Sequence, residues 1–188
     1  PGICDPGEDL VKHTRLNKLD VICIPGPCAV INALVCSGMN SSKFIFEGFL
    51  PKKNSERSKI LEEISQNEKT TVLFESPHRL MQLLNELREY CGGSREIQLS
   101  RELTKKFEEH IGKSLNEVIE FFKDREIIGE FTIVIKGLSK DRKKLDFDNQ
   151  KLKRDLYELI DAGLSLPAAS KYLAKKQKIP KRLIYNLY

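Results

Sequence analysis

The sequence contains no tryptophan and no apolar run long enough to cross a membrane. A membrane-spanning helix needs about 20 consecutive apolar residues. The most apolar stretch, VICIPGPCAVINALVC, is interrupted by Pro25, Gly26 and Pro27. Secretory-leader features are also missing at Pro1. We therefore expect a soluble cytoplasmic protein with no membrane contact.

Several catalytic and metal-binding patterns are absent as well. The cysteine count is odd and no pair has CxxC spacing, which argues against disulfides and zinc. His13, His78 and His110 lack the spacing of metal ligands, and no Ser-His-Asp order can be read. A Walker-type phosphate loop is missing too. We expect no metal, and neither acyl transfer nor P-loop chemistry is favoured.

The composition is that of a globular domain with a small appendage. The chain has 188 residues, of which 40% are hydrophobic and 31% are charged. This length allows one good core. A net charge of +5 is only mildly basic, so the distribution of charge matters more than its size.

Up to about residue 137 the pattern alternates between β-rich runs and amphipathic segments, which predicts an α/β fold. The expected strands are DVICIP, KFIFEGF, TTVLFES, REIQLSREL and EFTIVIKG. Helices are expected after Gly7, Pro27, Ser55, Pro77 and Ser114. The first of these should run over 8–19, and Ser55 is the expected N-cap of the third.

A different module follows a polar segment, 138–149, that is predicted to be a linker. Residues 150–188 predict three short helices, with Leu156, Leu173 and Ile179 among the apolar positions. No acidic residue occurs from Gly163 onward. Basic side chains suited to RNA phosphates are Lys171, Lys175, Lys176, Lys178, Lys181 and Arg182. The alternative is a solubilising tail.

The tail tyrosines bear on what this segment recognises. Of Tyr172, Tyr185 and Tyr188, two are expected in the core. Few rings would then remain for stacking on bases. The sequence therefore predicts phosphate binding without base recognition.

Polar residues cluster where predicted strands end. In IPGPCA a helix begins directly after a turn, which suits either an anion site or an ordinary βα loop. The next such segment, ESPHR, combines Glu75 and Arg79. The third, SRELTK, holds Ser100, Arg101, Glu102, Thr104 and Lys105. Since open α/β sheets bind ligands at strand ends, these segments indicate a site, with a solvated surface as the alternative.

PGICDPG, IPGPCA, FEGFLP, FESPHRL, SRELTKKFEE and GEFTIVI occur in this order in the chain. With these segments the sequence resembles the 16S rRNA (cytidine-2'-O)-methyltransferases of the tetrapyrrole methylase superfamily. The resemblance covers about 1–137. It implies S-adenosylmethionine as cofactor, held in a cleft between two α/β domains, and ribosomal RNA of the small subunit as partner. It also implies a homodimer.

The same resemblance implies a domain division. Residues 1–43 would be the remnant of a cofactor-binding α/β domain whose earlier part is not in this chain, and 44–137 a second α/β domain. The basic helical segment 150–188 would follow the linker. With one wall of the cleft missing, this chain alone would bind the cofactor weakly or be inactive.

Site residues follow from the resemblance position by position. Those implied to border the cofactor are Ile3, Pro25, Cys28, Ala29, Leu50, Ser76, Leu103, Gly129, Glu130, Phe131 and Thr132. Methylation of a ribose hydroxyl needs a proton acceptor and a cation, for which we expect Glu75 or Glu102 and Arg101 or Lys105 respectively. Arg79 is an expected RNA contact.

Two other functions remain open from the sequence. The chain could belong to an enzyme that methylates a small tetrapyrrole, although the basic tail favours RNA. It could also be a non-catalytic RNA-binding module. Titration with S-adenosylmethionine separates this module from both enzymes.

Overall fold

A computed structural model describes residues 1–177, 181–185 and 187–188, with side chains described except at positions 140–150, 177, 182 and 183. The chain divides into two compact units, Pro1–Leu138 and Ser139–Tyr188. Each unit is considered by itself. None of the described helices is long and apolar enough to span a membrane.

The first unit is built on a five-stranded mixed sheet with strand order β1-β2-β5-β3-β4. Its strands are β1 (Phe44–Phe49), β2 (Thr70–Glu75), β3 (Glu96–Arg101), β4 (Glu109–Ser114) and β5 (Phe131–Ile135). Strands β1 and β2 are parallel, and the other neighbours are antiparallel. The sequence predicted all of these strands except β4. This edge strand, EHIGKS, has little apolar alternation and forms by pairing with β3.

Helices of this unit begin close to the predicted positions. They are α1 (Glu8–Leu16), α2 (Ala29–Ser37), α3 (Asn54–Gln66), α4 (Pro77–Cys91) and α5 (Leu115–Phe122). Pro77 occupies the first turn of α4, and Gly92, with φ 80°, ends that helix. The Ser114 hydroxyl caps α5 by accepting the Glu117 N–H. Lys53, rather than the expected Ser55, is the N-cap of α3.

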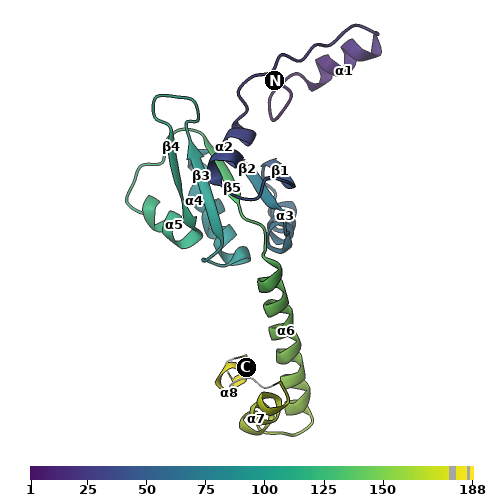
Figure 1. Ribbon diagram of the computed structural model, residues 1–188, viewed down its shortest axis with the longest axis vertical. Coiled ribbons are helices and arrows are strands. Elements are labelled where there is room, and N and C mark those ends of the chain that lie inside the picture. Colours follow the sequence, from purple (N-terminus) through teal and green to yellow (C-terminus); the bar gives the residue numbers. More distant parts are fainter. Residues whose placement is uncertain (178–180, 186) are drawn as a thin grey trace. The chain divides into compact units, whose positions relative to one another are not determined.

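Helices cover both faces of the sheet (Figure 1). On one face, α3, α4 and α5 pack against inward side chains such as Leu73, Leu99 and Ile133, which are fully buried. On the other face, α2 packs against Val72 and Val134. Because strand side chains alternate between faces, the central strands β2 and β5 contribute to both cores.

The strand expected at DVICIP does not form in the structure. Residues 20–25 have no regular secondary structure, and Ile22 and Ile24 are 85% and 86% exposed. A strand needs a hydrogen-bonded neighbour, and among the described residues none pairs with this segment. Helix α1 ends at Leu16, earlier than the expected 19, and it buries no residue.

The second unit consists of α6 (Lys140–Asp161), α7 (Leu166–Gln177) and α8 (Lys181–Tyr185). Its core contains Leu156, Ala169, Leu173 and Ile184. The segment 138–149, expected to be a linker, contains the start of α6, which begins at Lys140. The sequence has no Gly or Pro between Gly137 and Gly163, so nothing local interrupts this helix. The expected core residue Ile179 lies outside the described residues.

Candidate functional site at the converging strand ends

Three segments with polar motifs meet at one end of the sheet. Strand β5 lies between β2 and β3 and runs antiparallel to both, so its first residue lies beside their last residues. In the observed register, Phe131 pairs with Glu75 on one side and with Arg101 on the other. Sheet topology thus brings together the segments FES, SREL and GEFT, which are far apart in the sequence.

A cavity of about 340 Å³ opens at this end of the sheet. Its lining residues are Cys4, Ala29, Phe49, Phe74, Glu75, Ser76, Pro77, Glu130, Phe131 and Thr132. Ala29, Ser76, Glu130, Phe131 and Thr132 were expected to border a cofactor, so the structure brings this part of the set together. Phe49 and Phe74 were not expected, and their rings lie 5.6 Å apart between centroids. The sequence signal that could have indicated these two residues is their position as apolar residues at the ends of two predicted strands.

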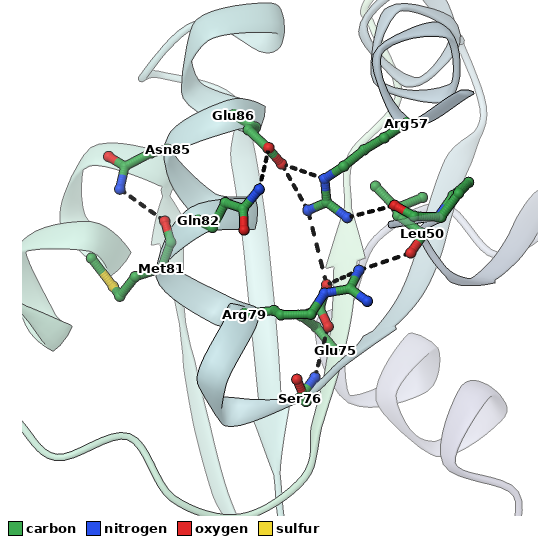
Figure 2. Close-up of polar contacts among 10 residues, drawn as sticks. Leu50, Arg57, Glu75, Ser76, Arg79, Met81, Gln82, Asn85 and Glu86 are labelled. Atoms are coloured by element: carbon green, nitrogen blue, oxygen red, sulfur yellow. Dashed lines mark hydrogen bonds and ion pairs between the residues drawn. The ribbon is translucent and has the colours of Figure 1, made fainter. Parts of the chain in front are cut away.

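Glu75, expected as a proton acceptor, lines the cavity and is buried in an ion-pair network (Figure 2). Its side chain is fully buried, and its Oε2 lies 3.1 Å from the Arg79 guanidinium and 4.0 Å from that of Arg57. Its Oε1 accepts the Ser76 N–H at 2.9 Å. The carboxylate therefore already has two cationic partners within the protein. The geometry favours a positioning role for Glu75.

Arg79 faces into this network rather than outward (Figure 2). It donates to the Leu50 carbonyl at 2.8 Å and forms an ion pair with Glu75 Oε2 at 3.1 Å. Arg57 from α3 pairs with Glu86 of α4 at 2.7 Å. The network therefore ties the ends of β1 and β2 to α3 and α4. This position of Arg79 disfavours the expected RNA contact.

The loop after β3 forms a second polar cluster around Glu102. Oε1 of Glu102 accepts the Glu130 N–H at 3.0 Å and the Lys105 ammonium at 3.1 Å. Lys105 also donates to the Glu130 carboxylate at 2.8 Å. Two of the expected catalytic residues thus contact Glu130, a residue of the cavity wall.

The backbone of this loop is unusual for its residue types. Glu102 and Thr104 have φ values of 51° and 66°, in the left-handed region that ordinary residues seldom adopt. Gly129 faces them with φ 92°, and a Cβ there would lie 2.9 Å from Glu102 Cγ. The close approach of Glu102 therefore requires a glycine at 129.

The charges in the loop shift one another's pKa. The Glu130 N–H, followed by Lys105, lowers the pKa of Glu102 below its ordinary value of 4.5. The Glu130 carboxylate, followed by Glu102, raises the pKa of Lys105 above 10.5. Both groups are therefore charged at neutral pH. Because a lowered pKa means a weaker base, Glu102 is better suited to holding a charge than to taking up a proton in a stable way.

Arg101 lies at the same strand end and contacts the loop before β5 and the first residue of β4. It donates from Nε to the Ile128 carbonyl at 2.8 Å and pairs with Glu109 at 3.4 Å. Its side chain is 22% exposed. Arg101 therefore orders residues beside the cavity while keeping part of its charge accessible.

The sequence did not suggest a row of three interacting side chains, Ser100, His110 and Glu108. Ser100 Oγ lies 3.0 Å from His110 Nδ1, and His110 Nε2 lies 3.0 Å from Glu108 Oε1. Pairing of β3 with β4 brings Ser100 opposite His110, which no sequence spacing could show. Ser100 is only 1% exposed, which disfavours a role as nucleophile. No metal-binding group of His, Cys, Asp and Glu occurs among the described residues.

Other expected site residues lie elsewhere. Ile3 is 60% exposed and Pro25 is also exposed, both away from the cavity lining. Cys28 and Leu103 pack beside α2. Leu50 places its side chain in the main core and offers its carbonyl to Arg79. In the second unit, the exposed lysines are Lys171, Lys175, Lys176 and Lys181. Lys178 and the Arg182 side chain lie outside the described residues.

Comparisons with known proteins identify the family of this chain. Residues 1–119 match the family model described as tetrapyrrole (corrin/porphyrin) methylases. The chain belongs to this family. Among solved structures, a cobalt precorrin-4 methyltransferase, CbiF, matches with a TM-score of 0.52 at 14% identity, covering 68% of this chain and 56% of that chain. The methyltransferase CobJ gives a TM-score of 0.50 at 18% identity, covering 69% and 56%. At these identities the likeness shows the fold.

Curated relatives of this tetrapyrrole methylase family member have higher sequence identity to it than these two solved structures have. A protein of Synechocystis named ribosomal RNA small subunit methyltransferase I is 38% identical over 187 residues, which is 100% of this chain and 67% of that protein. A protein of Bacillus subtilis with the same name is 35% identical over 191 residues, covering 100% and 65%. The chain spans about two thirds of the length of the curated relatives that it matches.

Proposed function

We propose that the protein containing this chain is an S-adenosylmethionine-dependent methyltransferase that acts on the 2'-hydroxyl of a cytidine in small-subunit ribosomal RNA. The observation that carries the proposal is the cavity at the neighbouring ends of β1, β2 and β5, lined by residues of five of the six ordered motifs. The name of the curated relatives supports ribosomal RNA as substrate. Such a substrate would be met in the cytoplasm, and the homodimer stays a prediction.

The cavity has a size and chemistry that suit part of this cofactor. About 340 Å³ lies at the lower end of the range for small-molecule sites. Phe49 and Phe74 offer aromatic surface for a purine, and the Glu130 carboxylate offers charge complementary to a cation. Ser76 and Thr132 add hydroxyl groups. S-adenosylmethionine, when bound, supplies the methyl group on a positively charged sulfur.

The chain's own residues would act mainly by positioning the reactants. A transfer from sulfur to a ribose oxygen needs the hydroxyl in line with the methyl group, and good alignment supplies much of the rate. Arg101 and Lys105 would stabilise negative charge on the hydroxyl oxygen as its proton leaves. Between the two candidate proton acceptors, Glu102 is the more accessible, with 18% of its side chain exposed against none for Glu75. We therefore assign to Glu102 a hydrogen bond accepted from the ribose hydroxyl, a role that a carboxylate with a lowered pKa can fill while it stays charged.

Methyl transfer from labelled S-adenosylmethionine to small-subunit rRNA tests the proposal, with this chain and with the protein at the length of its relatives. We expect Arg101→Ala and Glu102→Ala in the active form to lower the turnover about 100-fold or more. Their midpoints of urea unfolding should change little by comparison. Lys123→Ala, which removes an exposed ion pair with Glu120, is the matched control. Near-normal turnover in both site variants would refute the assigned site.

The description of the matching family, tetrapyrrole (corrin/porphyrin) methylases, favours one alternative, a tetrapyrrole substrate. The same assay with precorrin-type substrates in place of rRNA distinguishes the two. Transfer to the tetrapyrrole without transfer to rRNA would overturn the proposed substrate. Failure to bind S-adenosylmethionine at any length would instead favour a non-catalytic RNA-binding module.

A further inference from the structure

Two tyrosines of the second unit, one on α7 and one on α8, have exposed side chains. Tyr172 is 54% exposed and Tyr185 is 46% exposed. The core of this unit is filled without them, by Leu156, Leu173 and Ile184 among others. The expectation that two of the tail tyrosines belong to the core is therefore wrong, since Tyr188 is also 61% exposed.

Lysines flank both rings at helical spacing. Lys175 and Lys176 lie three and four residues after Tyr172, so their side chains neighbour its ring on the exposed face of α7. The buried face of the same helix carries Ala169 and Leu173. On α8, Lys181 and Tyr185 have the same four-residue spacing, and Ile184 packs into the core. We call Tyr172, Lys175, Lys176, Lys181 and Tyr185 the Tyr-Lys surface.

The charge of this surface has one sign. The sequence from 163 to 188 contains no Asp or Glu. The remaining exposed rings of the unit are arranged differently, because Tyr157 and Tyr188 contact each other at 5.6 Å and Lys153 lies 5.9 Å from the Tyr157 ring. No ring or ion contact of this kind is seen for Tyr172 among the described residues.

We propose that the Tyr-Lys surface binds unpaired RNA, with bases stacked on Tyr172 and Tyr185 and phosphates bound by the lysines. The choice of RNA rests on the proposed function, and the inference adds the structural state of that RNA. An exposed ring among cations suits a single strand, whose bases are free to stack. A duplex keeps its bases stacked inside, so only the lysines would contribute to its binding.

Binding of this chain to a single-stranded oligouridine and to a duplex RNA hairpin, measured by fluorescence anisotropy, tests the inference. We expect tighter binding of the single strand at equal salt. Tyr172→Ala should weaken this binding about tenfold, and Tyr172→Phe should retain it, because stacking needs the ring and not the hydroxyl. The matched control is Tyr90→Ala, which changes a tyrosine of α4 that is 40% exposed.

The lysines should affect the salt dependence of RNA binding. Lys175→Ala should reduce the slope of log K against log salt by about 0.7 and leave the preference for single strands in place. Equal affinity for the duplex, or unchanged affinity in Tyr172→Ala, would overturn the inference. A Tyr172→Ala variant that changes only the sedimentation coefficient would assign the surface to contact between copies and likewise overturn it.

These outcomes are separable from those of the methyl-transfer assay. Strand-selective binding that depends on Tyr172 can be present in a chain that transfers no methyl group, in which case the proposed function alone fails. Normal methyl transfer with no effect of Tyr172→Ala on RNA affinity gives the opposite result, and the inference alone fails. Circular dichroism of each variant checks that the helices are retained.

Discussion

At the scale of single residues, backbone conformation decides which side chains can approach the cavity. Glu102 reaches the Glu130 N–H because it adopts a left-handed φ and because Gly129 has no Cβ. Strained conformations of this kind cluster at functional sites, where surrounding contacts hold them in place. Two predictions test this arrangement.

Gly129→Ala should destabilise the first unit by about 1–3 kcal/mol, because φ 92° is unfavourable for alanine. The added Cβ would also lie 2.9 Å from Glu102 Cγ. The measurement is urea unfolding. Gly163→Ala is the control, since Gly163 has φ 95° but nothing within 4 Å of its added Cβ. Equal effects of the two substitutions would show that the Glu102 contact contributes nothing.

The Glu102 carboxylate should titrate below 4.5, since the Glu130 N–H and Lys105 favour its charged form. A folded-state pKa below the unfolded one means that the stabilisation is present above the unfolded pKa and is lost as pH falls through the folded pKa. We expect the Glu130 amide proton in NMR spectra to shift with a midpoint below 4.5. Glu102→Gln should abolish this shift. A midpoint above 4.5 would contradict the observed contacts.

At the scale of secondary-structure elements, one buried network joins four of them. Glu75 at the end of β2 contacts Arg79 of α4 and Arg57 of α3, and Arg79 also binds the carbonyl of Leu50, which follows β1 (Figure 2). Each helix therefore contributes one cation to a single buried carboxylate. This network fixes the part of the cavity wall formed by Phe49, Glu75 and Ser76.

Arg79→Ala should destabilise the protein by about 3 kcal/mol, because it leaves the buried Glu75 carboxylate with Arg57 alone, 4.0 Å away. Combining it with Glu75→Gln should cost less than the sum of the two single changes. Chemical denaturation measures both. The control is Lys53→Ala, which breaks the ion pair between Lys53 and Glu56, whose side chains are 71% and 57% exposed. This substitution should cost less than about 1 kcal/mol. A comparably small cost for Arg79→Ala would refute the network's role.

At the scale of the whole molecule, the two units differ in how completely they cover their apolar residues. The second unit surrounds its small core with three helices. In the first unit, residues 1–28 leave many apolar side chains exposed, among them Leu10 at 73% and Ile24 at 86%. Apolar surface of this extent commonly takes part in association.

We expect the chain to self-associate in a concentration-dependent manner, which sedimentation velocity measures. Ile22→Lys combined with Ile24→Lys should reduce the association, because both side chains are more than 80% exposed and their burial drives it. The control is Phe107→Lys, which changes an exposed apolar residue outside 1–28. Phe107 follows β3 in the chain and is 65% exposed. A monomer at all concentrations would contradict the prediction.

The sequence by itself determined the elements whose signals are local. Alternating and helical apolar patterns with Pro77 and Gly92 at the helix ends were sufficient for β1, β2, β3, β5 and the five helices of the first unit. The ordered motifs also identified the family, because residue types and their order do not depend on packing.

Tertiary structure decided whatever depends on neighbours distant in sequence. It left DVICIP unpaired, because a strand requires a partner, and it formed β4, because β3 offered one. It turned Glu75 and Arg79 inward, since the charge of each is best satisfied by the other. It also exposed Tyr172 and Tyr185, because helical spacing shows which side chains share a face and only packing decides which face is buried.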